Sequence, residues 1–145
     1  MNNIPKSTKL YLFFIFIAIS ILFIRCDKSN IPDAPVNFTI EIDDPLFLDL
    51  AVIGNHVFIK NAGVNGIIIY RSGINEFIAY DRTCTYKPEE NCAVIDDENL
   101  MGYVQCPCCG SKFSLAYSYP TEGEATRSLK KYNTNFDGTF LHVYN

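Results

Sequence analysis

From residue 37 onward, apolar residues either alternate with polar ones or gather in short runs. Phe38, Ile40 and Ile42 alternate with Thr39 and Glu41, and this period of two places one face of a strand against a core. Further runs are rich in Val, Ile, Tyr, Phe and Thr, which pack well on a pleated sheet. They predict strands at residues 47–52, 56–59, 66–70, 76–80, 103–105, 112–115, 128–132 and 139–144.

Turn residues separate these runs. Gly, Asn, Asp and Ser occur at Gly54-Asn55, at residues 61–63, at Asn65-Gly66, at Ser72-Gly73 and at Asp137-Gly138. No stretch beyond residue 37 keeps apolar residues at helical spacing over three turns. We therefore predict an all-β fold, a small sandwich or barrel of roughly nine or ten strands. Residues 37–145 contain no obvious linker and are expected to form one domain.

The apolar run at residues 10–24 has a different character. Lys6 and Lys9 precede it, and Ser20 alone interrupts it. It is shorter than the about 20 residues of a membrane-spanning helix and fits the roughly 7–15 residues of a signal-peptide core. Residues 1–26 are thus predicted to be a hydrophobic signal peptide or anchor helix. Residues 27–36, with two prolines, are predicted to be a tether.

Cys26 ends this segment. A cysteine after an apolar run, followed by the polar residues Asp27-Lys28-Ser29, resembles a bacterial lipoprotein processing site, where the cysteine is lipidated and becomes the new N-terminus. Arg25 departs from the small residue that this resemblance requires, and an uncleaved anchor is the alternative. We expect an exported, membrane-tethered protein of the periplasm or the outer membrane.

Charge and composition narrow the function. The net charge is −4, although residues 1–26 carry Lys6, Lys9 and Arg25 and no acid. An acidic body excludes nucleic acid as a partner, because phosphate contacts require clustered Lys and Arg. The two histidines, His56 and His142, fall in strand patterns and are expected to be sheet residues. With no catalytic triad and no phosphate-binding loop, an electron-transfer or binding module is expected rather than a stand-alone enzyme.

The cysteines carry the chemical information. After Cys26, all of them are assigned to two loops that follow strands. The first is recognised at residues 81–88 and is long enough to include Cys92, and the second is at residues 105–113. Cysteines used only to fill a core would be scattered, so this clustering predicts a disulfide, a metal site, or both. The loop cysteines are Cys84, Cys92, Cys106, Cys108 and Cys109.

Both loops resemble those of Rieske iron–sulfur proteins of the cytochrome bc type. The matching stretches are Cys84-Thr85-Tyr86, where that family has C-x-H, and Cys106-Pro107-Cys108-Cys109-Gly110-Ser111, where it has C-P-C-H-G-S. Downstream, Gly123-Glu124-Ala125-Thr126 with Leu129 and Tyr132 resembles the family's G-P-A…L…Y segment. The resemblance covers roughly residues 66–145. It implies a Rieske-like fold, a [2Fe–2S] cluster and one-electron transfer.

The resemblance also implies ligands by position. Cys84 and Cys106 match the two cysteine ligands of one iron, whereas Tyr86 and Cys109 stand where the two histidine ligands of the other iron belong. Ser111 matches the residue whose hydroxyl donates a hydrogen bond to cluster sulfur. Without the two imidazoles, the high-potential Rieske centre is not expected.

A disulfide is implied as well. Cys108 matches the disulfide cysteine of the second loop, and the resemblance then implies Cys92 as its partner, although Cys92 comes later than the family spacing.

Three occupancies of the site remain open. In the first, Cys84, Cys106 and Cys109 bind an iron–sulfur cluster, with Tyr86 or Cys92 as the fourth ligand. In the second, four thiolates such as Cys84, Cys92, Cys106 and Cys109 bind Zn²⁺. In the third, the cysteines form disulfides and no metal binds. The first predicts an electron carrier with a redox protein partner at the membrane surface. The others predict a binding or structural lipoprotein on a degenerate Rieske fold.

Overall fold

The structure is a computed structural model that describes residues 31–145. The predicted signal or anchor segment and Cys26 lie outside the described residues. In the part of the chain from residue 31 onward, no helix has the length and apolar character needed to cross a membrane.

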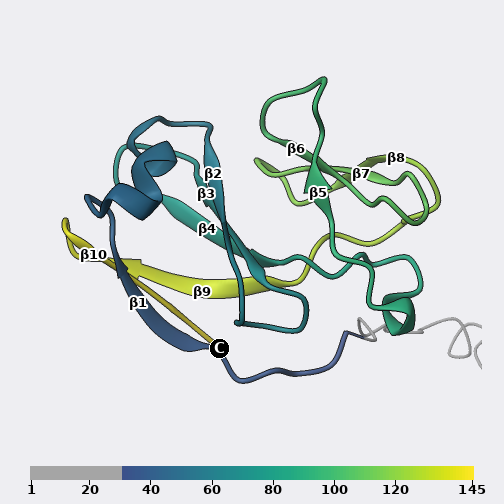
Figure 1. Cartoon of the computed structure of the whole chain (residues 1–145), viewed down its shortest axis with the longest axis horizontal. Helices are drawn as coiled ribbons and strands as arrows, with labels where there is room; N and C mark the ends of the chain where they lie inside the picture. The colour runs from purple at the N-terminus through teal and green to yellow at the C-terminus, as the bar shows by residue number, and fades with distance from the viewer. Residues whose placement is uncertain (1–30) are drawn as a thin grey trace, which may run out of the picture.

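Residues 31–145 form two antiparallel sheets, which confirms the predicted all-β fold (Figure 1). The larger sheet runs in the order β1 (Asn37–Glu41), β10 (Phe140–Tyr144), β9 (Lys131–Phe136), β4 (Phe77–Asp81), β3 (Ile67–Arg71) and β2 (His56–Ile59). The smaller sheet runs in the order β5 (Ile95–Asp96), β6 (Tyr103–Gln105), β7 (Lys112–Ser114) and β8 (Pro120–Glu122). The smaller sheet and both cysteine loops are therefore inserted between the neighbouring strands β4 and β9.

Strands β3 and β4 of the larger sheet are buried on both faces. In β3, Ile67 and Ile69 belong to one hydrophobic core, whereas Ile68 and Tyr70 belong to a second core shared with the smaller sheet. Successive side chains of a strand point to opposite faces, so an unbroken apolar run is what a strand between two cores requires. The second core also contains cysteines of both loops. Strands β3 and β4 thus pack directly against the residues that support the candidate site.

One predicted strand is wrong. Residues 47–52 lie mostly in the 3₁₀ helix η1 (Pro45–Ala51), where the backbone N–H of Leu46 donates to the Asp44 carboxylate at 2.8 Å. Pro45 suits the first turn of a helix, because it lacks the N–H that would remain unpaired there. The capping carboxylate and the proline outweigh the strand-like composition that follows them.

The other strand predictions differ in detail. β2 and β6 have the predicted bounds, but β9 begins later than expected, at Lys131. The short strands β5 and β8 were not predicted, and a second 3₁₀ helix, η2 (Pro88–Glu90), lies in the first cysteine loop.

Candidate metal centre

The first cysteine loop, residues 82–94 (loop one), folds back on itself. The N–H of Cys84 donates to the carbonyl of Cys92 at 2.8 Å, and that of Val94 donates to the carbonyl of Arg82 at 2.8 Å. An isolated antiparallel bridge joins Thr83 to Ala93 between these two hydrogen bonds. Cys84 and Cys92 therefore face each other across a narrow ribbon that leaves the end of β4.

The second cysteine loop, residues 106–111 (loop two), is the tight connection between β6 and β7. The N–H of Cys106 donates to the carbonyl of Ser111, and the N–H of Gly110 donates to the carbonyl of Cys106, both at 2.8 Å. Gly110 has a φ of 74°, which glycine adopts at little cost. This reversal brings Cys109 back over Cys106, so both cysteines lie on the side that faces loop one.

A disulfide between Cys92 and Cys108 joins the two loops. It is the pair that the Rieske resemblance implies. The bond also removes Cys92 from the alternative ligand sets in which it was considered, since a disulfide sulfur is not a thiolate.

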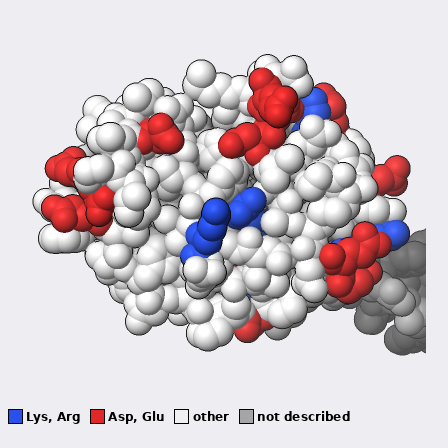
Figure 2. Space-filling model, viewed as in Figure 1, with Lys and Arg blue, Asp and Glu red and all other residues white. Residues whose placement is uncertain are grey.

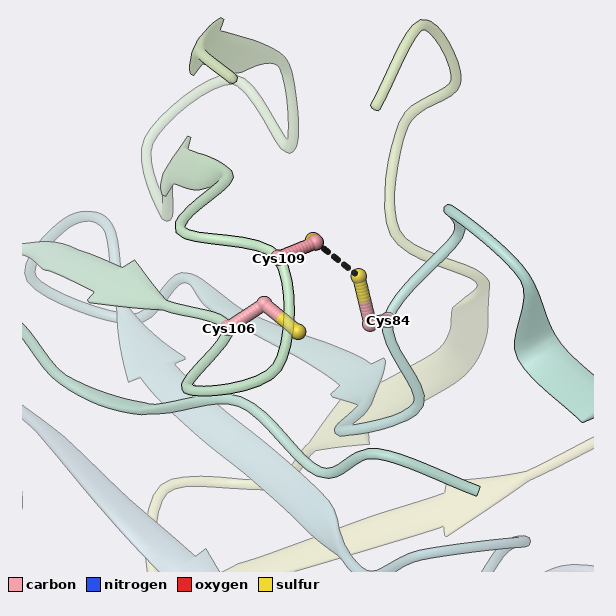
Figure 3. A group of neighbouring side chains, drawn as sticks. All are labelled: Cys84, Cys106 and Cys109. Carbon is pink, nitrogen blue, oxygen red and sulfur yellow. Dashed lines mark hydrogen bonds between the residues drawn. The ribbon is translucent and has the colours of Figure 1, made fainter. Parts of the chain in front are cut away.

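Three free thiols converge beside this disulfide. The sulfur atoms of Cys84, Cys106 and Cys109 all lie within 4.8 Å of one another, and those of Cys84 and Cys109 are 3.7 Å apart. Figure 3 shows the three side chains pointing toward a common centre between the loops. Cys84 and Cys106 are buried, whereas Cys109 is partly exposed. The group therefore has an enclosed side and a side that reaches the surface.

Local contacts act differently on two of the thiols. Burial raises the pKa of Cys84 well above that of an ordinary thiol, and a hydrogen bond from the backbone N–H of Tyr86 offsets only part of this effect. Burial also acts to raise the pKa of Cys109, but hydrogen bonds from the hydroxyl and backbone N–H of Ser111 and from Cys106 and Cys84 together lower it. Of these two thiols, Cys109 is thus the one whose surroundings favour the anionic form that binds metals.

Ser111 is held in place by the segment after β8. Its hydroxyl oxygen accepts the N–H of Ala125 at 2.9 Å and lies 3.2 Å from the sulfur of Cys109. The Cys109 thiol donates to this oxygen, and once Cys109 is a thiolate the Ser111 hydroxyl can donate to the sulfur instead. The position matches the role that the resemblance implies for Ser111.

Tyr86 contributes a backbone contact to the site. Its N–H hydrogen-bonds the sulfur of Cys84, its ring packs against the second core, and the Lys87 ammonium lies 5.4 Å from the ring centroid. The backbone contact was not predicted, because every residue except proline has an N–H and the sequence carries no signal for it. Among the described residues, no His, Asp, Glu or further Cys joins the three sulfurs.

The histidines lie in strands, as predicted. The His56 ring in β2 is 2.6 Å from the Asp96 carboxylate, and the His142 ring in β10 is 2.7 Å from the Asn37 amide oxygen. Neither is grouped with the cysteines.

No known family model and no curated protein matches the chain. Among solved structures, the chain is similar to one described as a complex of reduced oxygenase and oxidized ferredoxin in carbazole 1,9a-dioxygenase. The identity is 20%, the match covers 63% of this chain and 82% of that one, and the TM-score is 0.44. A likeness this distant does not establish an activity, so the interpretation of the site depends on its own residues.

The donor set has the chemistry of a metal centre. Thiolate–metal bonds of about 2.3 Å in a tetrahedral site place sulfur atoms about 3.8 Å apart. The Cys84–Cys109 separation of 3.7 Å is close to this value. Thiolates are also the usual ligands of iron–sulfur clusters. The close spacing of the three sulfurs thus fits three positions around one metal ion. The same thiolates are of the kind that an iron–sulfur cluster requires.

Proposed function

We propose that loops one and two hold an iron–sulfur cluster and that the protein transfers single electrons. Cys84, Cys106 and Cys109 are the thiolate ligands, and Tyr86 is the candidate for the fourth position. The observation that carries this proposal is the convergence of three free thiols from two loops that a disulfide holds together. The resemblance of both loops to Rieske proteins supports a [2Fe–2S] cluster in particular.

The surroundings of the cysteines suit an electron carrier. When bound, such a cluster accepts and returns one electron, and thiolate ligands lower its potential relative to a centre with two histidines. The buried thiols Cys84 and Cys106 shield one side, and the partly exposed Cys109 brings the other side to the surface. A redox protein partner would approach at Cys109.

The experiment is spectroscopic. The full chain is purified without oxygen, and its visible absorption, iron and acid-labile sulfide are measured. We expect a coloured protein that contains iron and sulfide in equal amounts. The colour and the iron should be lost in Cys84→Ser, Cys106→Ser and Cys109→Ser. They should be retained in the control Cys26→Ser, which leaves both loops intact. A colourless protein without iron overturns the cluster. Zinc bound by the same three cysteines would then identify a structural metal site.

Membrane attachment is the second part of the proposal. The apolar segment and Cys26 are proposed to export the chain and tether it by a lipid, so that the domain works at a membrane surface. Labelled palmitate should enter the wild-type protein and not the Cys26→Ser variant. Label absent from the wild type but present in a control lipoprotein would leave an uncleaved anchor as the alternative.

A second candidate function, a protein-binding module, is favoured by a separate cleft. This cleft of about 590 Å³ lies between η1 and β2 on one side and the β5–β6 hairpin on the other. Figure 2 shows acidic side chains gathered over the β5–β6 end of this face. The carboxylates of the cleft are Asp49, Asp96, Asp97 and Glu98.

Apolar side chains lie beside these carboxylates. Leu46 and Met101 line the cleft and are each 80% exposed, and Leu100 is exposed next to Met101. Such a mixture is complementary to a protein segment in which a Lys or Arg lies next to an apolar residue. This partner class would suit a structural lipoprotein that needs no redox centre.

The cleft is tested with a short synthetic peptide of alternating Lys and Leu. We expect the peptide to shift amide NMR signals only of residues in the cleft, and salt should weaken these shifts. The shifts should be smaller in Met101→Ser and Asp49→Asn. They should be unchanged in Glu124→Gln, because Glu124 lies outside the cleft. Equal shifts over every acidic surface would overturn the binding-module candidate.

A further inference from the structure

Cys106 belongs to two groups of sulfur atoms at once. Its sulfur lies within 4.8 Å of those of Cys84 and Cys109, and also within 4.8 Å of both sulfurs of the Cys92–Cys108 disulfide. Among the described residues, it is the free thiol that shares both groups. Cys106 therefore lies next to the other two candidate ligands, as Figure 3 shows, and also next to the disulfide that joins the loops.

We propose that Cys106 is also the nucleophile of an internal thiol–disulfide exchange. Its thiolate forms a bond to the sulfur of Cys92. The electron pair of the Cys92–Cys108 bond leaves on the sulfur of Cys108, which takes up a proton in place of the one lost by Cys106. One disulfide is broken and one is formed, so the reaction needs no external oxidant or reductant.

The two disulfide cysteines differ in burial, and this difference decides which sulfur Cys106 attacks. Cys92 is buried, whereas Cys108 is exposed. When Cys108 leaves, water solvates the thiolate as it forms, whereas a thiolate released at Cys92 would have to form in the core. The opposite attack, on Cys108, would also close a ring over Pro107 alone, whose φ is fixed. We therefore expect the product to be the Cys92–Cys106 disulfide.

This product keeps the loops joined but changes the site. Cys92 of loop one remains bonded to loop two, now through Cys106. One of the three metal-binding thiols is consumed, and a thiol appears at the exposed Cys108. The exchange thus removes one ligand from the metal centre, while a disulfide still joins the two loops.

A bound metal would suppress the exchange. This part of the inference rests on the proposed function, because a Cys106 thiolate that is bound to a metal cannot attack the disulfide. The exchange itself needs only the chain. Loss of the metal therefore frees Cys106 and moves the disulfide.

The exchange is tested by disulfide mapping. The full chain with Cys26→Ser is stripped of metal without oxygen, then trapped with N-ethylmaleimide in acidic denaturant, and its peptides are analysed by mass spectrometry. We expect the Cys92–Cys106 disulfide together with alkylated Cys108, at an unchanged number of free thiols. A maleimide polymer too bulky for buried thiols, applied to the folded protein, should label Cys108. Added Zn²⁺ should lower both signals.

Two variants distinguish the exchange reaction itself from its suppression by a bound metal. In Cys106→Ser we expect the Cys92–Cys108 disulfide alone. In Cys84→Ser the exchange should persist, but Zn²⁺ should no longer suppress it. If the metal-free protein contains only the Cys92–Cys108 disulfide, the exchange is overturned whatever metal the protein binds. If exchange occurs but Zn²⁺ leaves it unchanged in the parent protein, the exchange stands and its control by the metal centre is overturned.

Discussion

Gly123 allows the close packing that positions Ser111 beside Cys109. A Cβ atom at residue 123 would lie 2.5 Å from the Cα and 2.9 Å from the backbone nitrogen of Ser111, and Gly123 has a φ of +88°. Backbone atoms cannot yield as a flexible side chain can. A larger residue would therefore displace Ser111 and, with it, the hydroxyl next to the Cys109 sulfur.

We predict that Gly123→Ala lowers the free energy of unfolding by more than the about 1 kcal/mol typical of alanine at a positive φ. The matched control is Gly138→Ala, because Gly138 has a φ of +109° and a Cβ atom there would have no neighbouring atom within 4 Å. Urea unfolding measures both variants. Equal losses would show that backbone strain alone matters and that the contact with Ser111 does not.

The sequence marks the cysteines of the two loops, but it does not say which of them are free thiols and which form a disulfide. The pattern Cys106-Pro107-Cys108-Cys109-Gly110-Ser111 marks loop two by itself, since it places three cysteines and a glycine within six residues. Whether Cys92 is a ligand or a disulfide partner depends on the distance between two loops, which sequence spacing does not encode. The structure decides this for Cys92, and it also shows the backbone contact of Tyr86 with Cys84.

At the scale of elements, Asp97 organises the β5–β6 connection. Its carboxylate accepts the backbone N–H of Asn99 at 3.0 Å and pairs with the Lys112 ammonium of β7 at 3.1 Å. These contacts, first the hydrogen bond from Asn99 and then the one from Lys112, lower the pKa of Asp97. The charged carboxylate thus stabilises the smaller sheet at neutral pH.

We predict that Asp97→Asn is less stable than the wild type at pH 7 and that the gap narrows at acidic pH. A carboxylate whose pKa is lowered by folding contributes its stability above the unfolded value of about 3.9, and loses it as the pH falls through the folded value. Urea unfolding at pH 7, 5 and 3 measures the gap. Glu98→Gln removes the same charge from the exposed neighbouring residue and should show no comparable gap. A gap for Asp97→Asn that is constant with pH would contradict this.

Elements with a strong repeating pattern were the predictable ones. The alternation of β1 and the apolar runs of β3 and β4 each reflect burial against a core, which the sequence records directly. The helix η1 was missed because Asp44 and Pro45, rather than the apolar residues after them, decide the backbone there. Strand β5 has only two residues, both exposed, so no apolar pattern marks it.

At the scale of the whole molecule, Tyr80 links the two sheets. It lies in β4, and its buried hydroxyl donates to the carbonyl of Leu115, just after β7, at 3.0 Å. Burial raises the pKa of Tyr80 to about 12, so the hydroxyl keeps its proton at every ordinary pH. The pairing of the two sheets was not foreseeable from either strand, because a single hydrogen bond across a core leaves no periodic trace in sequence.

We predict that Tyr80→Phe loosens the smaller sheet and, with it, the support of loop two. The substitution removes the phenolic donor to a buried carbonyl, which costs about 1–3 kcal/mol. Hydrogen exchange should therefore accelerate at the amides of β6, β7 and Leu115 more than at those of β1 and β10. Tyr144→Phe is the control, because Tyr144 is exposed and lies in β10, which does not neighbour β4 in the larger sheet. Uniform acceleration across both sheets would mean that Tyr80 stabilises the chain as a whole. Since loop two begins where β6 ends, a selective effect should also weaken metal retention at Cys106 and Cys109 while leaving the larger sheet intact.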